Sequence, residues 1–451
     1  MNLNHLHPWS LALAALLALA ACGGDDDNVV PPSTETTVAL LPVLETANET
    51  GLSDMDDPAV WVHPSDRGRS LVIAAAKRGG LRVFDLQARE VQRVDIAYDG
   101  TGEPANRFNN VDVQYGFALG GERVDLVVAS DRLQDALRIW RVDAADTTSP
   151  LEDVTDDAIG RTFPTRPDPA DRVNASVPNP ADGENTAYGL ALWRDRTQDK
   201  LYALVAQNNE AVVAMFELVA RPGGKVGMEF VARWQFPYEW KGQDLTVEND
   251  DDPSKDFSPQ FEGMVVDQQT GVLYAGQEDV GIWRVNLHTR VADTAPFVQT
   301  TAFDAASPIA RDVEGLTLYY AANGKGYLLA SSQGQAHGEP PTLATPGRDD
   351  TFAVFARDAG NGYLGSFAVP RNPALGIDAV QECDGADVTN VALPGFPGGL
   401  LLVQDGYNDD LNNLDGEEAA TNLKFVPWAG VAANFPGGRL VVDTMYDPRN
   451  P

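Results

Sequence analysis

Cysteine and histidine are scarce in this 451-residue sequence, and their scarcity argues against two kinds of site. The two cysteines are Cys22 and Cys383, and the first lies in an N-terminal apolar stretch, so we expect no internal disulfide. The five histidines show no spacing typical of metal ligands, which argues against zinc. The fold must therefore depend on a hydrophobic core, which a chain of this length can build.

Basic residues are also few, because 33 Lys and Arg stand against 66 Asp and Glu, for a formal net charge of -33. Such a surface repels nucleic acid and anionic membranes and attracts cations. An acidic surface that serves solubility explains the same count. The aromatic content of 8% and the many β-branched residues are too high for a disordered acidic chain.

Long hydrophobic runs are missing except near the N-terminus, where LALAALLALAAC is too short to span a bilayer comfortably. Leu19-Ala20-Ala21-Cys22 resembles a bacterial lipoprotein signal, which predicts a signal peptide at 1–21, lipidation of Cys22 and a flexible polar tether at 22–37. The alternative is an ordinary secretory signal with a chance cysteine. We expect the cell envelope of a Gram-negative bacterium, with lipid anchoring at the outer membrane or periplasm, or secretion.

Long helical periodicity is equally scarce, and short alternating apolar runs between Gly, Asp, Asn and Pro predict an all-β chain. A polar start that leads into an apolar strand recurs six times, as DDPAVWV from Asp56, NNVDVQY from Asn109, AYGLALW from Ala187, FEGMVVD from Phe261, VEGLTLYY from Val313 and DGADVTNVAL from Asp384.

After each start come an apolar strand, a polar loop and an alternating strand, as in LVIAAAKRGGLRVFDL from Leu71 or LYAGQEDVGIWRV from Leu273. Such a unit cannot bury both faces alone, and radial packing solves this problem. The repeat predicts a six-bladed β-propeller over residues 38–451, with a pair of β-sandwiches as the alternative. TTVALLPVLE near Thr37 and the late GGRLVVDTMY are candidate strands that close the ring.

Rotation about the propeller axis places equivalent polar positions on two rings, which we expect to face one mouth of the channel. The ring of strand starts comprises Asp56, Asp57, Asn110, Asp112, Tyr188, Glu262, Asp312, Glu314, Asp384 and Asp387. The ring of loops comprises Lys77, Arg78, Asp131, Arg132, Asn209, Glu210, Glu278, Asp279, Asp405 and Asn408.

So many carboxylates repel one another unless cations neutralise them, and a mixed set of oxygen ligands favours calcium. For any single acid the cap of a turn is the better explanation, so the prediction of a cation site rests on the whole set. The bases Lys77, Arg78 and Arg132 indicate an anionic ligand such as a phosphate, or else salt bridges to the acidic ring.

In DDPAVW, KRGGLRVFDL, EGMVVD, DVEGLTLYYAANGKGYLLASSQG and NLKFVPW, the chain resembles the β-propeller phytases, the calcium-dependent 3-phytases of bacteria. The matching motifs occur in family order from about residue 40 to about residue 430. The resemblance implies a six-bladed propeller that hydrolyses phytate, myo-inositol hexakisphosphate, with several calcium ions. It further implies a cleavage site and an adjacent site for a second phosphate.

The resemblance also implies roles for individual residues. The implied metal ligands are Glu45, Asp57, Tyr188, Glu262, Glu278, Asp312, Glu314, Asp378, Asp384 and Asn408. The implied catalytic residues are Lys77, Arg132, Tyr188 and Glu262, and the implied substrate-binding residues are Lys77, Arg78, Arg132, Asn209 and Glu210. Asn209 stands where the family commonly has a lysine, and a lost charged contact to phosphate costs about 1.5 to 3 kcal/mol.

The expected activity is therefore calcium-dependent hydrolysis of a phosphomonoester by direct attack of water, on phytate bound as its calcium complex by a monomer. The sequence has no RHGxRxP motif and no Cys-x5-Arg loop, which excludes the histidine acid phosphatases and the cysteine phosphatases. The competing interpretations are a non-catalytic, calcium-stabilised binding propeller and a calcium-dependent propeller lactonase.

Overall fold

The computed structural model describes residues 39–163, 184–247, 255–333, 349–358, 360–408 and 420–450. By its internal contacts the chain divides into residues Met1–Thr37 and Val38–Pro451, and the fold below belongs to the second unit. The predicted signal peptide, the predicted lipidation site Cys22 and the whole predicted tether at 22–37 lie outside the described residues. Within those residues, no helix has the length and apolar character that a membrane crossing requires.

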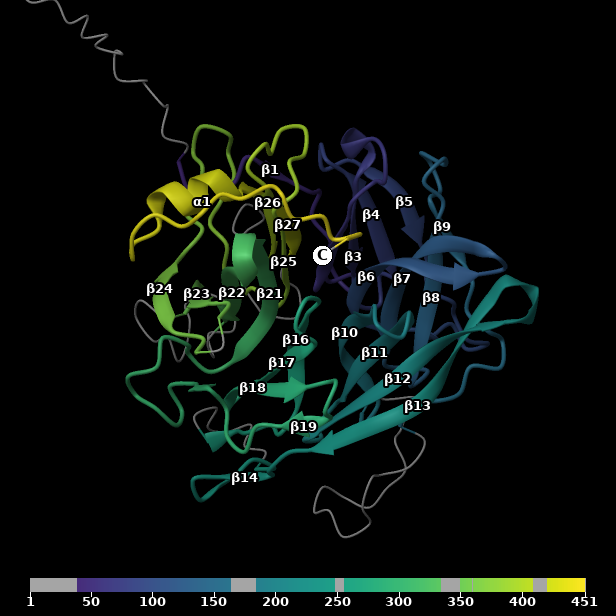
Figure 1. Cartoon of the computed structure of the whole chain (residues 1–451), viewed down its shortest axis with the longest axis horizontal. Helices are drawn as coiled ribbons and strands as arrows, with labels where there is room; N and C mark the ends of the chain where they lie inside the picture. Colours follow the sequence, from purple (N-terminus) through teal and green to yellow (C-terminus); the bar gives the residue numbers. More distant parts are fainter. Residues whose placement is uncertain are drawn as a thin grey trace, which may run out of the picture. The chain divides into compact units, whose positions relative to one another are not determined.

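Six antiparallel sheets form the blades of a six-bladed β-propeller, which confirms the predicted fold (Figure 1). The first three blades are β2 (Pro58–Trp61), β3 (Leu71–Ala75), β4 (Leu81–Asp85) and β5 (Glu90–Val94); β6 (Phe108–Leu119), β7 (Glu122–Asp131), β8 (Ala136–Val142) and β9 (Leu151–Asp153); and β10 (Ala187–Asp195), β11 (Lys200–Gln207), β12 (Val212–Arg221) and β13 (Lys225–Gln235).

The fourth blade carries an additional short strand, and the sixth takes one strand from the beginning of the unit. These blades are β16 (Phe261–Asp267), β17 (Val272–Gln277), β18 (Gly281–Asn286), β19 (Val291–Ala292) and β20 (Val298–Gln299); β21 (Val313–Ala321), β22 (Lys325–Ser332), β23 (Thr351–Ala356) and β24 (Tyr363–Phe367); and β25 (Ala386–Thr389), β26 (Leu400–Asp405), β27 (Asn422–Pro427) and β1 (Leu44–Glu45).

Outside the blades lie a short hairpin and a few short helices. They are β14 (Glu239–Trp240), β15 (Gln243–Asp244), α1 (Trp428–Asn434) and 3-10 turns at Arg67–Arg69, Pro222–Gly224 and Ala322–Gly324.

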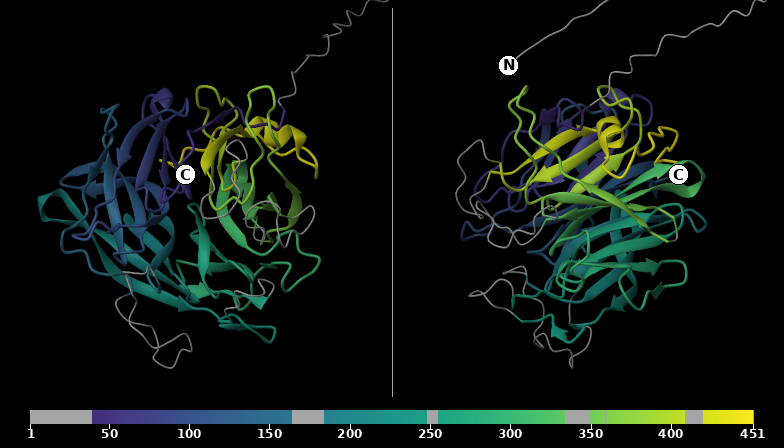
Figure 2. Two further views of the ribbon diagram at one scale, coloured as in Figure 1. Left: turned by 180° about the vertical axis from the view of Figure 1, so that it is seen from behind. Right: turned by 90° about the vertical axis from the view of Figure 1, so that its left-hand side faces the viewer.

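The ring closes in two ways. The inner strands β2, β6, β10, β16, β21 and β25 contact one another in order, and β25 contacts β2 (Figures 1 and 2). In addition, β1 pairs with β27, so the first and last strands share a blade, and the predicted closing role of TTVALLPVLE is confirmed. The predicted strand in GGRLVVDTMY is wrong, because the chain there is irregular and forms no sheet.

The core lies between the blades, as radial packing requires. β3 and β26 are buried along their full length, so their sequences LVIAA and LLLVQD read as nearly continuous apolar runs. Large aromatic side chains fill the spaces between sheets, as where Trp193 of the third blade and Trp283 of the fourth join one cluster. The outer strands are more exposed, as in β5, where no residue is buried.

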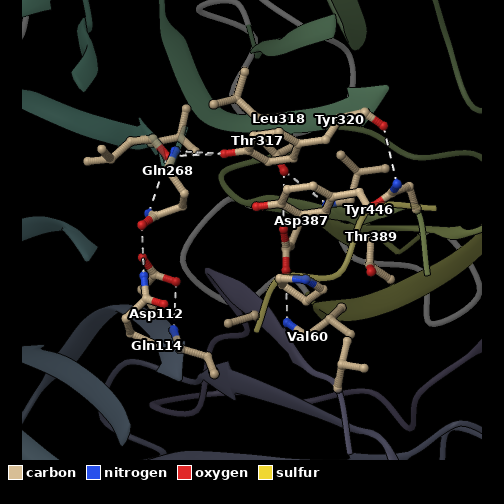
Figure 3. Close-up of a pocket in the computed structure, with 18 of the residues that line it drawn as sticks. Val60, Asp112, Gln114, Gln268, Thr317, Leu318, Tyr320, Asp387, Thr389 and Tyr446 are labelled. Atoms are coloured by element: carbon tan, nitrogen blue, oxygen red, sulfur yellow. Dashed lines mark hydrogen bonds between the residues drawn. The ribbon is translucent and has the colours of Figure 1, made fainter. Parts of the chain in front are cut away.

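Acidic side chains also fasten neighbouring inner strands to each other. The backbone N–H of Val60 donates to Asp387 Oδ2 at 2.8 Å (Figure 3), and that of Leu192 donates to Asp112 Oδ2 at 2.7 Å. Each bond joins two blades. Burial raises the pKa of Asp112 to about 7, against the effect of these backbone bonds. Asp112 and Asp387 therefore join neighbouring inner strands around the ring.

The C-terminal segment covers the channel at the ends of the inner strands. The ring of Tyr446 stacks on that of Tyr320, with centroids 4.0 Å apart and planes 2° from parallel (Figure 3). Arg449 donates to both carboxylate oxygens of Asp125 and to the carbonyl of Val62. The C-terminal segment thus joins blades without adding a strand. This explains why its apolar residues were wrongly predicted to form a strand.

Candidate active site

Four inner strands begin with the same two-residue pattern, in which a tyrosine or an acid is followed by glycine. The pairs are Tyr188-Gly189, Glu262-Gly263, Glu314-Gly315 and Asp384-Gly385. In the first three of these strands, the register with the neighbouring strand shifts across the pair. Such a bulge bends the strand and re-aims a side chain. The local sequence therefore turns the side chain before the glycine out of the regular strand alternation.

The glycines allow adjacent inner strands to approach until their backbones touch. A Cβ atom on Gly189 would lie 2.2 Å from the carbonyl oxygen of Glu262, and one on Gly263 would lie 2.0 Å from that of Glu314. On Gly315 a Cβ would lie 2.9 Å from the carbonyl oxygen of Asp384. No other residue fits these positions without displacing the next strand. The contacts form a series in which each glycine positions the acid of the following blade.

Glu262, Glu278 and Glu314 converge as a result, and we call them the glutamate cluster. One carboxylate oxygen of each lies within 4.8 Å of the others, and all three side chains are buried. Among the described residues, no Lys, Arg or His nitrogen lies within 4.0 Å of these carboxylates, and Glu278 Oε1 and Glu314 Oε2 accept no hydrogen bond. The cluster is therefore a buried set of oxygen ligands without a counter-charge in contact.

Neutral side chains fix the orientation of the cluster. The hydroxyl of Tyr188 donates to Glu262 Oε2, and Asn109 Nδ2 donates to Glu262 Oε1 at 2.6 Å. Gln260 Nε2 donates to Glu278 Oε2 at 2.8 Å. The sequence reasoning missed Asn109 and Gln260. It selected Asn110 from NNVDVQY, although the adjacent Asn109 is the residue that reaches the cluster, and no spacing signal marked Gln260.

The electrostatics of the cluster call for a cation. Burial, followed by repulsion from Glu262, raises the pKa of Glu278 and of Glu314 well above the usual range. Deprotonating them without a counter-charge would leave several buried like charges, which is costly. Oxygen-only ligands of this kind suit a hard divalent cation such as calcium. The unpartnered Glu278 Oε1 and Glu314 Oε2 fit such an ion.

Basic residues lie at the same mouth, beside the acids rather than apart from them. Lys77 Nζ lies 2.6 Å from Asp54 Oδ2, 3.3 Å from Asp56 Oδ2 and 3.6 Å from Asp384 Oδ2. Although burial alone would lower the pKa of Lys77, these carboxylates hold it well above the usual range. Lys77 thus makes the salt bridges that were the alternative interpretation of the bases.

Arg132 approaches the cluster from the opposite side. Its guanidinium lies 4.8 Å from the ring centroid of Tyr188, and Nη1 donates to Asn109 Oδ1 at 3.3 Å. Burial, and then repulsion from Arg107, lowers the pKa of Arg132, while Tyr188 and Glu262 oppose this change. The Nε of Arg78 is buried and has no hydrogen-bond partner among the described residues. Two bases therefore lie on the flanks of the glutamate cluster, and a third is close in sequence.

The loop that carries Asn209, between β11 and β12, contributes less positive charge than the loops that carry Lys77 and Arg132. Asn209 adopts the left-handed conformation, φ 57°, and its backbone N–H donates to Gln260 Oε1 at 2.9 Å. Lys77 has a similar conformation in the first loop, with φ 42°. Glu210 is fully buried and accepts a hydrogen bond from the hydroxyl of Tyr238. Asn209 is therefore near the cluster through Gln260, whereas the Glu210 carboxylate is used to hold Tyr238.

Three of the implied metal ligands lie in a second group, on the sixth blade. Asp378 contacts the ammonium group of the fully buried Lys424. Asn422 Nδ2 donates to Glu45 Oε2 at 3.2 Å, and Asn408 Nδ2 donates to Asn48 Oδ1 at 3.3 Å. The structure thus separates Glu45, Asp378 and Asn408 from the glutamate cluster.

The remaining implied ligands surround the cluster. Asp57 Oδ2 accepts a hydrogen bond from the backbone N–H of Val111 at 3.1 Å, which is a bond between blades. Asp312 Oδ1 lies 3.8 Å from Arg311 Nε. Asp384 accepts from Gln333 Nε2 at 2.5 Å and faces Lys77. Each of these three acids therefore already has a partner within the chain.

Comparison with known proteins shows which family this chain is similar to. A family model described as Phytase matches residues 9–450. A 3-phytase of Bacillus subtilis (strain 168) is 28% identical over 383 residues, which are 84% of this chain and 81% of that protein. A solved structure of BBS1N in complex with ARL6DN, soaked with lead, covers 82% of this chain and 78% of its own, with 10% identity and a TM-score of 0.37. That structural likeness is too weak to support a conclusion.

Replacing Gly263 by alanine should disturb the cluster, since its Cβ would lie 2.0 Å from the Glu314 carbonyl oxygen. We expect a loss of about 1 to 3 kcal/mol in the free energy of unfolding, as for other overpacked sites, and weaker calcium binding. Chemical denaturation and calcium titration measure the two effects. The control is Gly362→Ala, whose Cβ would meet no atom within 4 Å. Unchanged calcium affinity in Gly263→Ala would show that close approach does not position Glu314.

The stabilising effect of calcium should depend on pH. In chelator, Glu278 and Glu314 retain protons that the unfolded chain releases near pH 4.5, so their contribution to stability falls as pH rises above that value. Asp56, whose pKa burial raises from 3.8 to about 7, loses its contribution to stability over that same rise in pH. The melting temperature in calcium minus that in chelator should therefore widen from pH 4.5 to above 7. A constant difference would show that protons and calcium do not compete for these carboxylates.

Proposed function

Because the chain belongs to the phytase family and releases phosphate from phytate, we propose that it does so with calcium ions held by the glutamate cluster. The observation that carries this proposal is the convergence of Glu262, Glu278 and Glu314, buried and without a base in contact among the described residues. Uncompensated buried carboxylates cost several kcal/mol each, so a native state that keeps them ionised needs a cation.

Calcium suits this site better than the alternatives. The cluster offers carboxylate oxygens, with the Tyr188 hydroxyl nearby, and no thiolate or imidazole is part of it. Hard cations with flexible coordination prefer such ligands. Tyr188, Asn109 and Gln260 set the orientation of the carboxylates before any ion arrives, which reduces the ordering cost of binding.

Two groups of residues would contribute to hydrolysis, the glutamate cluster that holds calcium and the bases Lys77 and Arg132. When bound, calcium supplies positive charge for the phosphate oxygens and lowers the pKa of a water molecule. Arg132 offers a planar fork, and Lys77 a point charge, to the equatorial oxygens of the phosphate that is attacked. Charge stabilisation of this kind is most of what phosphoryl transfer requires of a protein. Water then displaces the inositol alkoxide, and no covalent phosphoenzyme is formed.

The substrate would bind as its calcium complex. A chain with a formal net charge of -33 repels a bare polyanion, and calcium bound to phytate reduces this repulsion. Asn209 brings no charge to the third loop, so the second phosphate would be held by hydrogen bonds or by Arg78. We propose a monomer, since the ring of blades closes within one chain through the pairing of β1 with β27.

A lipid anchor on Cys22 is part of the same proposal and would place the enzyme at the cell envelope, or in the medium if the anchor is released. The support is the sequence LAAC with the polar stretch that follows it. In detergent phase separation of expressing cells, the wild type should enter the detergent phase and Cys22→Ser should not. Equal partitioning of the two would contradict the anchor.

Phosphate release from phytate, measured with calcium and with excess chelator, tests the proposed cofactor. We expect release with calcium and its loss with chelator, and Glu314→Gln should lose most of the activity at equal calcium. Glu122→Gln, which changes an exposed glutamate of β7, is the matched control and should keep full activity.

The alternatives give different results in this experiment. Equal release in chelator would contradict the role of calcium. A protein that melts higher in calcium but releases no phosphate from phytate would be a calcium-stabilised binding propeller.

A further inference from the structure

The acids around the mouth differ in whether a base of the chain touches them. Lys77 contacts Asp54, and the buried Lys424 contacts both Asp378 and Asp405. A third base, Arg311, contacts Asp279, directly beside the glutamate cluster. The sequence interpretation gave Arg311 no role, and the proposed mechanism does not use it.

Arg311 is held in one orientation by groups on three sides. It precedes β21 and is 8% exposed, and its Nε contacts Asp279 Oδ1. Its Nη2 donates to the carbonyl of Asp256, and its guanidinium lies 4.1 Å from the ring centroid of Phe257. A guanidinium fixed in this way is a permanent positive charge, since arginine does not lose its proton in proteins.

The positive charge of Arg311 lies near acids that adjoin the glutamate cluster in the chain. Asp279 follows Glu278 in the chain, and Asp312 is two residues before Glu314. Burial and then repulsion from Asp312 raise the pKa of Asp279 well above its usual range, while Arg311 opposes this. Without Arg311, the buried Asp279 would lose the base that contacts it, and Asp312 would lose the guanidinium whose Nε lies 3.8 Å from its Oδ1. The unpartnered oxygens Glu278 Oε1 and Glu314 Oε2 already point to a missing cation there.

We propose that Arg311 is a resident counter-ion that takes the place of one further divalent cation at the edge of the glutamate cluster. This inference rests on the proposed calcium site. Arg311 neutralises Asp279, so the ions that exchange with solvent are limited to those held by the glutamate cluster itself. It acts through the acids and does not touch the substrate, so it is a positioning residue.

Substitution of Arg311 should expose the latent cation site. In Arg311→Gln we expect a calcium stoichiometry about one ion per chain higher than in the wild type, measured by calorimetric titration. We also expect a lower melting temperature in chelator that calcium largely restores. Arg311→Lys keeps the charge and should keep the wild-type stoichiometry.

A matched control separates this effect from the loss of any buried arginine. Arg357 pairs with the buried Asp267 at 2.7 Å, and its guanidinium lies 4.3 Å from the ring centroid of Tyr320. It therefore resembles Arg311 in burial, acid partner and aromatic contact, but lies by Tyr320 and not at the glutamate cluster. Arg357→Gln should lose stability without binding more calcium. An equal gain of calcium in this variant would overturn the proposal.

The double variant Arg311→Gln/Asp279→Asn tests whether the Asp279 charge recruits the additional ion. It removes both charges and should return to the wild-type stoichiometry, so a retained additional ion would overturn the proposal. Wild-type stoichiometry in Arg311→Gln, or failure of that variant to fold at any calcium concentration, would also overturn it. If the wild type itself binds no calcium, the proposed calcium site fails, and that outcome is distinct from a failure of the Arg311 proposal alone.

Discussion

The close approach of neighbouring inner strands is the constraint on which the candidate site depends. Gly189, Gly263 and Gly315 place backbone against backbone, at distances that leave no room for a Cβ atom. The strands bulge at these glycines in the third, fourth and fifth blades, so the preceding Tyr188, Glu262 and Glu314 turn toward one mouth. Packing of the main chain therefore fixes the positions of the acidic side chains. Hydrogen bonds, bases or cations must then satisfy these side chains at those positions.

The chain satisfies its buried acids in two ways. Asp57, Asp112 and Asp387 accept hydrogen bonds from the backbone of an adjacent blade, and so hold the ring together. A second set is paired with lysine or arginine. The glutamate cluster has neither solution in full, because Glu278 Oε1 and Glu314 Oε2 receive no hydrogen bond from the described residues. These two glutamates are among the acids that the proposed reaction uses.

The sequence predicted the architecture better than it predicted the role of each acid. Alternation and the sixfold repeat predicted the blades, because burial against a neighbouring blade imposes the same pattern on each. The same repeat placed Asp112 and Glu262 in one ring, yet Glu262 lies within the bulge of β16 and reaches the cluster, whereas Asp112 follows the corresponding bulge of β6 and accepts a hydrogen bond from the backbone of Leu192. The contacts of Gln260 and Arg311 depend on loop conformations that do not repeat from blade to blade, so no sequence pattern predicted them.

Glycine is unevenly distributed among the starts of the inner strands, and the blades with and without it supply different charges to the mouth. In the first and second blades, Pro58 and Val111 follow the polar strand start where the other four blades have glycine, and these two blades supply Lys77 and Arg132 from their loops. The glycine-bearing blades supply the glutamate cluster. Lys77 reaches Asp384 on one side, and Arg132 reaches Tyr188 on the other, so the bases lie at both borders of the acidic arc. A phosphate monoester bound across such a border would meet cations held by the acids on one face and a fixed base on the other, which is the arrangement that its hydrolysis needs.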